Sequence, residues 1–123
     1  MEKNYQVSFF EKDDGTFPAE EFINALEIKL SAKVYRILSM IEENGPELRE
    51  PYSSHLNDGI FEVRARVGTD LARVLYFFVI GKRVIATNGF VKKTQKTPPS
   101  EIVKAKIYRR EFLEKEAQKN ENS

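Results

Sequence analysis

The pattern of apolar positions along the chain changes its period twice. A run of β-branched and aromatic residues at Tyr5–Phe10 predicts a strand, and Asp13–Gly15 predicts the turn that follows it. From residue 18 to residue 44 the apolar residues recur every three or four positions, which predicts helix. A mostly polar stretch over residues 47–59 predicts an irregular connection. Apolar-rich strand patterns return after residue 60.

The helical pattern has a marked start and a marked end, but no marked break inside it. Thr16 is a capping residue type and Pro18 suits a first helical turn, so the helix should begin there. Asn44–Pro46 should end it. One helix of this length is long for a small domain. The alternatives are therefore a single helix over 18–44 or a hairpin that breaks near Ser31–Ala32.

Three strands are predicted in the C-terminal half of the chain, at Ile60–Val67, Asp70–Ile80 and Arg83–Val91. The loops between them, Gly68-Thr69 and Gly81-Lys82, have two residues each with glycine first, which is typical of type II′ hairpins. All three strands should therefore be antiparallel neighbours.

A final helix should begin at Ser100, a good N-terminal cap, and the tail from about residue 119 should be frayed. The length of 123 residues predicts a single domain over residues 1–123.

The two loops also predict which residues face each other across the strands. Arg64 should lie directly opposite Arg73, and Arg73 opposite Phe90. One step nearer the first loop, Arg66 and Lys92 should share a row. Because side chains alternate across a sheet, one face should be apolar and should pack against the N-terminal helical region. That face should carry Phe61, Val63, Ala65, Val67, Ala72, Val74, Tyr76, Phe78, Ile85, Thr87, Gly89 and Val91. The other should carry Glu62, Arg64, Arg66, Leu71, Arg73, Leu75, Phe77, Asn88, Phe90 and Lys92.

The second face concentrates positive charge at one end. Like charges opposite each other destabilise a sheet, so a cluster of Arg64, Arg66, Arg73 and Lys92 requires a reason. Glu62 lies diagonal to Arg73 and can form a salt bridge, but one carboxylate does not neutralise four cations. Guanidinium groups match phosphate oxygens two at a time. The pattern therefore predicts an anion site.

The distribution of charge along the chain also favours an anion site in this region. Residues 1–50 hold 11 acidic and six basic side chains, whereas residues 82–123 hold 11 basic and five acidic ones, although the net charge is only +1. Lys82 begins this basic third, and Lys93 and Lys96 should extend the basic face as a groove that follows a nucleic-acid backbone would need. A polyanionic partner is expected.

Several classes of chemistry are excluded by what the chain lacks. It has no cysteine, and His55 is its only histidine, which excludes disulfides, Cys-based metal sites and a two-histidine ribonuclease mechanism. No metal or phosphate-loop motif is present, so no metal and no cofactor is expected. Catalysis should then be of the kind in which the 2′-hydroxyl of RNA attacks the neighbouring phosphate, arginines stabilise the transition state and a lysine shuttles protons. No signal peptide and no apolar run of membrane-spanning length is seen, so a cytoplasmic protein is expected.

Three motifs carry a resemblance to a known family. "EVR", "ARVLYF" and "GFVKKTQKTP" occur in this order within residues 58–110. This segment resembles the RelE/HigB-type toxins of bacterial type II toxin–antitoxin modules, and within them the phage-related HigB-like subgroup. The resemblance implies a small α+β domain with a twisted, mainly antiparallel sheet, an N-terminal helical pair on one face and a C-terminal helix.

It also implies a ribosome-dependent mRNA endonuclease, silenced by a cognate antitoxin that is a small helix-turn-helix protein. The implied partners are the ribosome, mRNA, the antitoxin and, for the toxin–antitoxin complex, operator DNA, with no membrane. The matching positions are Arg64, Arg73, Phe90, Lys92 and Lys93. Many relatives have a tyrosine or histidine acid or base near the C-terminal end. Here the only nearby candidate is Tyr108, on the apolar side of the last helix.

The expected function is therefore that of a metal-independent mRNA interferase. Its catalytic residues should be Arg64, Arg73, Lys92 and Lys93, and its other RNA contacts should be Arg66, Phe90, Lys96 and Lys82. Two alternatives stay open: a ParE-like gyrase inhibitor without nuclease activity, and a non-catalytic RNA-binding module.

Overall fold

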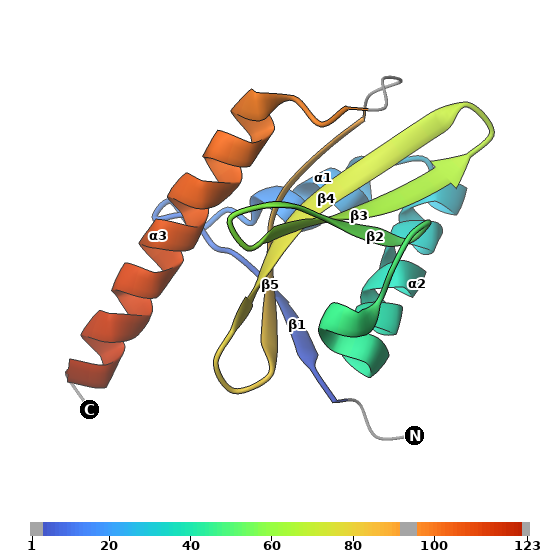
Figure 1. Cartoon of the computed structure of the whole chain (residues 1–123). Coiled ribbons are helices and arrows are strands. Elements are labelled where there is room, and N and C mark those ends of the chain that lie inside the picture. The colour runs from blue at the N-terminus through green and yellow to red at the C-terminus, as the bar shows by residue number, and fades with distance from the viewer. Residues whose placement is uncertain (1–3, 92–95, 122–123) are drawn as a thin grey trace.

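A computed structural model of the chain describes residues 4–91 and 96–121, which form a five-stranded mixed sheet with helices on both faces (Figure 1). The elements are β1 (Gln6–Phe9), α1 (Pro18–Ala25), α2 (Ile28–Asn44), a short 3-10 turn (Gly45–Glu47), β2 (Ser53–Asn57), β3 (Ile60–Val67), β4 (Asp70–Val79), β5 (Arg83–Val91) and α3 (Pro99–Glu121). The strand order is β1-β5-β4-β3-β2, and only β1 and β5 are parallel neighbours. The predicted α+β architecture is confirmed.

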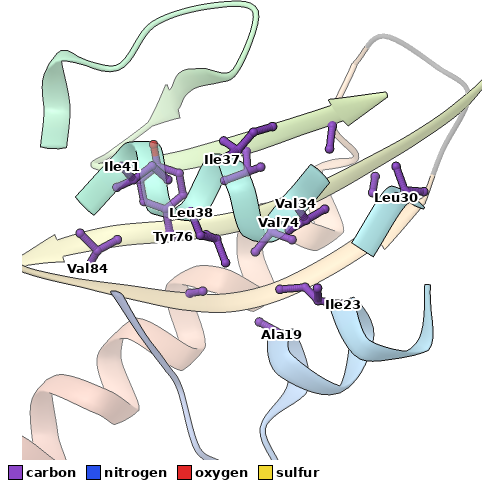
Figure 2. Close-up of a cluster of buried hydrophobic side chains, with 14 residues drawn as sticks. Ala19, Ile23, Leu30, Val34, Ile37, Leu38, Ile41, Val74, Tyr76 and Val84 are labelled. Carbon is purple, nitrogen blue, oxygen red and sulfur yellow. The ribbon is translucent and has the colours of Figure 1, made fainter. Parts of the chain in front are cut away.

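The larger core lies between the sheet and the two N-terminal helices. Figure 2 shows the apolar side of α2 pointing toward Val74 and Tyr76 of β4. Val34, Ile37 and Ile41 of α2 are buried there, at the helical spacing that the sequence predicted. This packing fixes the position of α2 on the sheet and so places Lys33 beside β3.

A second core lies on the opposite face, under α3. Ala105 and Phe112 of α3 pack with Leu75 and Phe77 of β4, and Tyr108 stacks on Phe10 with 4.7 Å between ring centroids. Helix α3 continues to Glu121, so residues 119–121, which the sequence assigned to the tail, are helical in the structure. In the described ranges, 4–91 and 96–121, no helix combines the length and apolarity that crossing a membrane requires.

The N-terminal helical region is a pair of helices, but the break falls at Leu26–Glu27 rather than near Ser31–Ala32. Leu26 has an extended backbone with ψ 158°, and its N–H donates to the carbonyl of Ile23. The Glu27 carboxylate then accepts from the backbone N–H of Lys29 and caps α2. Helix α1 begins at Pro18 as predicted, with Phe17 rather than Thr16 at the cap position.

The connection that was predicted to be irregular contains β2, which the sequence did not reveal. Strand β2 has the sequence SSHLN, which lacks the apolar alternation by which strands are recognised. It pairs antiparallel with the first half of β3, and the Ser53 hydroxyl is hydrogen-bonded to the Tyr76 hydroxyl in the core. The residues just before β2 are thereby held against β3.

The first hairpin has the predicted loop, Gly68-Thr69, with the predicted pairing on both sides. The second loop comprises three residues, Ile80–Lys82, because Val79 pairs with Arg83. A register shift of one residue between β4 and β5 offsets the additional loop residue, because Leu75 pairs with Asn88 whereas Tyr76 pairs with Ala86.

Because these two deviations cancel, Arg64 lies opposite Arg73, and Arg73 lies opposite Phe90, as predicted. Nearer the second loop the facing of β5 differs from the prediction. Ile85 belongs to the core under α3, and its neighbour Val84 belongs to the core under α1 and α2.

Candidate functional site

The sheet has an open edge where β2 stops pairing with β3. Ser53 of β2 pairs with Val63, and residues 64–67 of β3 continue past it without a further strand partner on that side in the described part of the chain. An open edge displays backbone donors and acceptors that neighbouring groups can use.

Two contacts use this edge. The backbone N–H of Arg64 donates to the carbonyl of Tyr52, with 2.9 Å between nitrogen and oxygen. The ammonium of Lys33, on α2, donates to the carbonyl of Arg66 at 2.6 Å. A loop and a helix that are distant in sequence are therefore both anchored to one short stretch of β3.

A groove of about 420 Å³ runs along this edge, and we call it the basic groove. Its lining residues are Lys33, Glu50, Pro51, Tyr52, Arg64, Arg66 and Leu71. Three of these side chains are cations, one is a carboxylate and one is an aromatic ring. The excess of positive charge and the ring are the combination with which proteins bind nucleic-acid strands.

Arg64 and Arg66 are two residues apart on β3, so their side chains emerge on the same face of the sheet. The Arg66 side chain is exposed, whereas that of Arg64 is 21% exposed and lies with its NH1 atom 3.8 Å from Oε2 of Glu62. The contact with Glu62 restrains the Arg64 guanidinium at the groove wall. A restrained guanidinium loses less conformational entropy when it binds an anion.

Arg73 lies beneath the groove, in a buried polar network. Its side chain is 0% exposed, and its Nε atom lies 3.5 Å from Oε1 of Glu62, which is also buried. The Thr97 hydroxyl donates to Glu62 Oε1 at 2.8 Å and accepts from Arg73 NH1 at 3.0 Å. The carbon centre of the Arg73 guanidinium is 6.0 Å from the ring centroid of Phe90. Glu62 is therefore shared by Arg64 at the groove and Arg73 below it.

This position changes the interpretation of Arg73. Burial lowers the pKa of Arg73 from its ordinary value, and the nearby charges of Arg64 and Arg66 lower it further, whereas Glu62 raises it. An arginine stays protonated even so, and its charge is stabilised by Glu62. The Arg73 guanidinium has no exposed surface in this structure, so Arg73 is placed to position Glu62 and, through it, Arg64.

The other predicted site residues are distributed unevenly. Lys92 and Lys93 lie outside the described residues. Phe90 is half-buried beside Arg73, and Lys96 is exposed one residue before Thr97. Lys82 is in the loop after β4, whereas the basic groove is at the beginning of β4, a strand about 30 Å long for its 10 residues. Lys82 therefore lies away from the arginines of the basic groove.

Among the charged and aromatic residues of the basic groove, three were not predicted from the sequence. Lys33 comes from the polar side of α2, and Glu50 and Tyr52 come from the connection before β2. No local signal distinguishes them from surface residues, because only the helix break and the undetected strand bring them to β3.

His55 is not among the residues that line the basic groove. The backbone N–H of Gly59 donates to its Nε2 atom at 3.2 Å, and its ring meets the ring of Phe61 edge-on at 5.0 Å. Within residues 4–91 and 96–121, no three histidine or carboxylate side chains are grouped as metal ligands would be.

Residues 21–110 match the family model described as phage-derived protein Gp49-like (DUF891), and a search of curated proteins gave no match. The matched range includes α2, the connection before β2, β3 and β4, and so every residue that lines the basic groove. Because the match covers well over half of the chain, the protein belongs to the family of phage-derived Gp49-like proteins, which is a RelE/HigB-like toxin family.

Proposed function

We propose that the protein is the toxin of a type II toxin–antitoxin module and that it cleaves mRNA on the ribosome. Membership of a toxin family implies an antitoxin partner. The observation that carries the nuclease proposal is the basic groove, in which Arg64, Arg66 and Lys33 converge on one edge of β3. A surface of this kind suits a phosphodiester backbone better than it suits a protein target, since its cations outnumber its single carboxylate.

The proposed reaction uses the RNA's own nucleophile. The 2′-oxygen forms a bond to the adjacent phosphorus and the bond from phosphorus to the 5′-oxygen breaks, which yields a 2′,3′-cyclic phosphate and a 5′-hydroxyl. Arg64 and Arg66 stabilise the charge that develops on the phosphate oxygens in the transition state. One group must take the 2′-hydroxyl proton and another must give a proton to the 5′-oxygen.

The proton-transfer groups proposed are a carboxylate and a lysine. Glu50 is the carboxylate that lines the basic groove and is the proposed base for the 2′-hydroxyl. Lys92 or Lys93 is the proposed acid for the 5′-oxygen, in keeping with the motif "GFVKK". Tyr108, which stacks on Phe10 in the core under α3, takes no part.

Mapping the ends of the RNA fragments tests this chemistry. Translated mRNA incubated with the protein and ribosomes should give fragments that end in 2′,3′-cyclic phosphate and begin with 5′-hydroxyl. Fragments with 3′-hydroxyl and 5′-phosphate ends would contradict attack by the 2′-hydroxyl. Absence of cleavage together with gyrase–DNA adducts in cells would instead support a ParE-like gyrase inhibitor.

Glu50→Gln should separate binding from chemistry. The substitution removes a negative charge from the basic groove, so a single-stranded oligonucleotide that lacks the 2′-hydroxyl nucleophile should bind at least as tightly as before. The cleavage rate at saturating substrate should fall on the order of 100-fold or more, because the amide does not accept the 2′-hydroxyl proton. Single-turnover cleavage and a binding titration measure the two effects. Tighter binding with an unchanged rate would show that Glu50 is not the base.

A further inference from the structure

Tyr52 has a position that the proposed reaction does not explain. Its side chain lines the basic groove and the residue is 40% exposed, yet the ring belongs to neither apolar core and stacks on no other ring among residues 4–91 and 96–121. An exposed aromatic ring is ordinary on its own. Here the ring is beside three cations in a hollow whose other side chains are mostly charged.

The backbone that carries this ring is fixed at both of its polar groups. The Tyr52 carbonyl accepts from Arg64 at 2.9 Å, and its N–H donates to the carbonyl of Arg49 at 3.1 Å. The next residue, Ser53, begins β2 and is buried. The ring is therefore presented from a rigid position directly beside the strand residue that we assign to the phosphate.

From this geometry we infer that Tyr52 is a stacking platform for a nucleobase and that the basic groove takes single-stranded nucleic acid, an inference that rests on the proposed function of the same groove. Arg64 and Arg66 are about 7 Å apart along β3, so they can contact the backbone at two points while the base lies on the ring. A base offers its face to a protein ring only when it is unstacked, which a paired strand does not allow. The groove should therefore select unpaired nucleotides, whatever their sequence.

The chain provides its own matched control. Tyr35 is 37% exposed, close to the value for Tyr52, but it lies on α2 outside the basic groove and its hydroxyl donates to Asn24 at 2.6 Å. If exposure of a tyrosine were enough for binding, the two residues would behave alike.

The test uses a ligand that binds without being cleaved. A single-stranded oligodeoxynucleotide has no 2′-hydroxyl, so its affinity reports binding only. Tyr52→Ala should weaken that affinity about 10-fold or more, whereas Tyr52→Phe and Tyr35→Ala should leave it within about twofold. The same oligodeoxynucleotide annealed to its complement should bind the unmodified protein at least about 10-fold more weakly than the single strand.

A fluorescence measurement distinguishes stacking from charge attraction. The chain contains no tryptophan, so Tyr52→Trp introduces a single reporter in the basic groove. Its emission should be quenched by the single strand and should be unaffected by inorganic polyphosphate, which has the charge but no bases. Equal quenching by both would overturn the inference.

The remaining outcomes are decisive as well. Equal affinity for single strand and duplex, an unchanged affinity in Tyr52→Ala, or no oligonucleotide binding by the unmodified protein would each overturn the stacking role. Failure of the proposed function is recognised separately: a Tyr52-dependent affinity without any cleavage of mRNA would leave the platform and remove the nuclease. Normal cleavage of mRNA by the Tyr52→Ala protein would leave the nuclease proposal and remove the stacking role of Tyr52.

Discussion

Arg64→Ala should lower the rate of mRNA cleavage on the order of 100-fold or more while the protein stays folded. Arg64 is the guanidinium of the basic groove that is both accessible and restrained, through its contact with Glu62. Removal of one preorganised donor to a developing negative charge has a cost of this size because no water molecule is held in the same place. Cleavage of translated mRNA on ribosomes measures the rate, and growth after induced expression measures toxicity.

Two further variants make the result specific to the groove. Arg64→Lys keeps the positive charge but loses the planar fork, so it should retain only part of the activity. Lys82→Ala removes a cation of the basic third at the far end of β4, outside the basic groove, and should cleave at the normal rate. An Arg64→Ala protein that is folded, as judged by circular dichroism, and fully toxic would remove the groove from the mechanism.

How much of this site the sequence predicts depends on how local the signals are. The pairing of Arg64 with Arg73 follows from one glycine loop, and that loop is correct. The pairing of Arg73 with Phe90 is also correct, but only because two deviations from the prediction cancel. The second loop is one residue longer than predicted, and a register shift inside the sheet compensates for it. Neither feature has a marked signature in the sequence.

The composition of the basic groove is less predictable, because it depends on tertiary packing. Lys33 reaches β3 only because α2 begins at Ile28 and packs its apolar side against the sheet. Tyr52 reaches the groove because the polar strand β2 pairs with β3. Residue type says that Lys33 and Tyr52 are suitable for binding RNA, but only the fold brings them together.

Burial of an arginine is the feature that sequence reasoning handled least well. Arg73 was expected to face an anion in the same way as Arg64, since both belong to one face of the sheet. In the structure Thr97 and Phe90 are packed around Arg73, and Glu62 is its charged partner. The sequence analysis considered a salt bridge between Glu62 and Arg73 as one reason for the cluster. In the structure this buried pair is the part of the cluster that supports the fold.

The network of Arg73, Glu62 and Thr97 leads to the second large expected effect. Arg73→Ala should lower the free energy of unfolding by about 3–5 kcal/mol, because it leaves the buried Glu62 carboxylate without its closest buried cation. Denaturation in urea, followed by circular dichroism, measures the loss. Loss of toxicity in this variant would therefore reflect loss of fold, and would not show that Arg73 contacts RNA.

A matched variant separates the two explanations. Replacing Glu62 by leucine, Arg73 by methionine and Thr97 by valine removes all three interacting polar groups at similar volume. A buried ion pair that is replaced by well-packed apolar side chains is often neutral for stability, so most of the loss caused by Arg73→Ala should be recovered. A triple variant as unstable as Arg73→Ala would show that the destabilisation does not come from an uncompensated buried charge.

The same triple variant tests the role of Arg73 in cleavage. If Arg73 acts only by holding Glu62, and Glu62 by restraining Arg64, the folded triple variant should lose about 10-fold in rate, well short of the loss in Arg64→Ala. Arg64 would still be present in the basic groove, but without the carboxylate that orients its guanidinium. A loss as large as that of Arg64→Ala, in a protein with normal stability, would show that the Arg73 guanidinium reaches the phosphate in the bound state. Single-turnover cleavage by the unmodified protein, Arg64→Ala and the triple variant, at matched folded concentration, decides whether Arg73 positions Arg64 or is itself a second phosphate ligand.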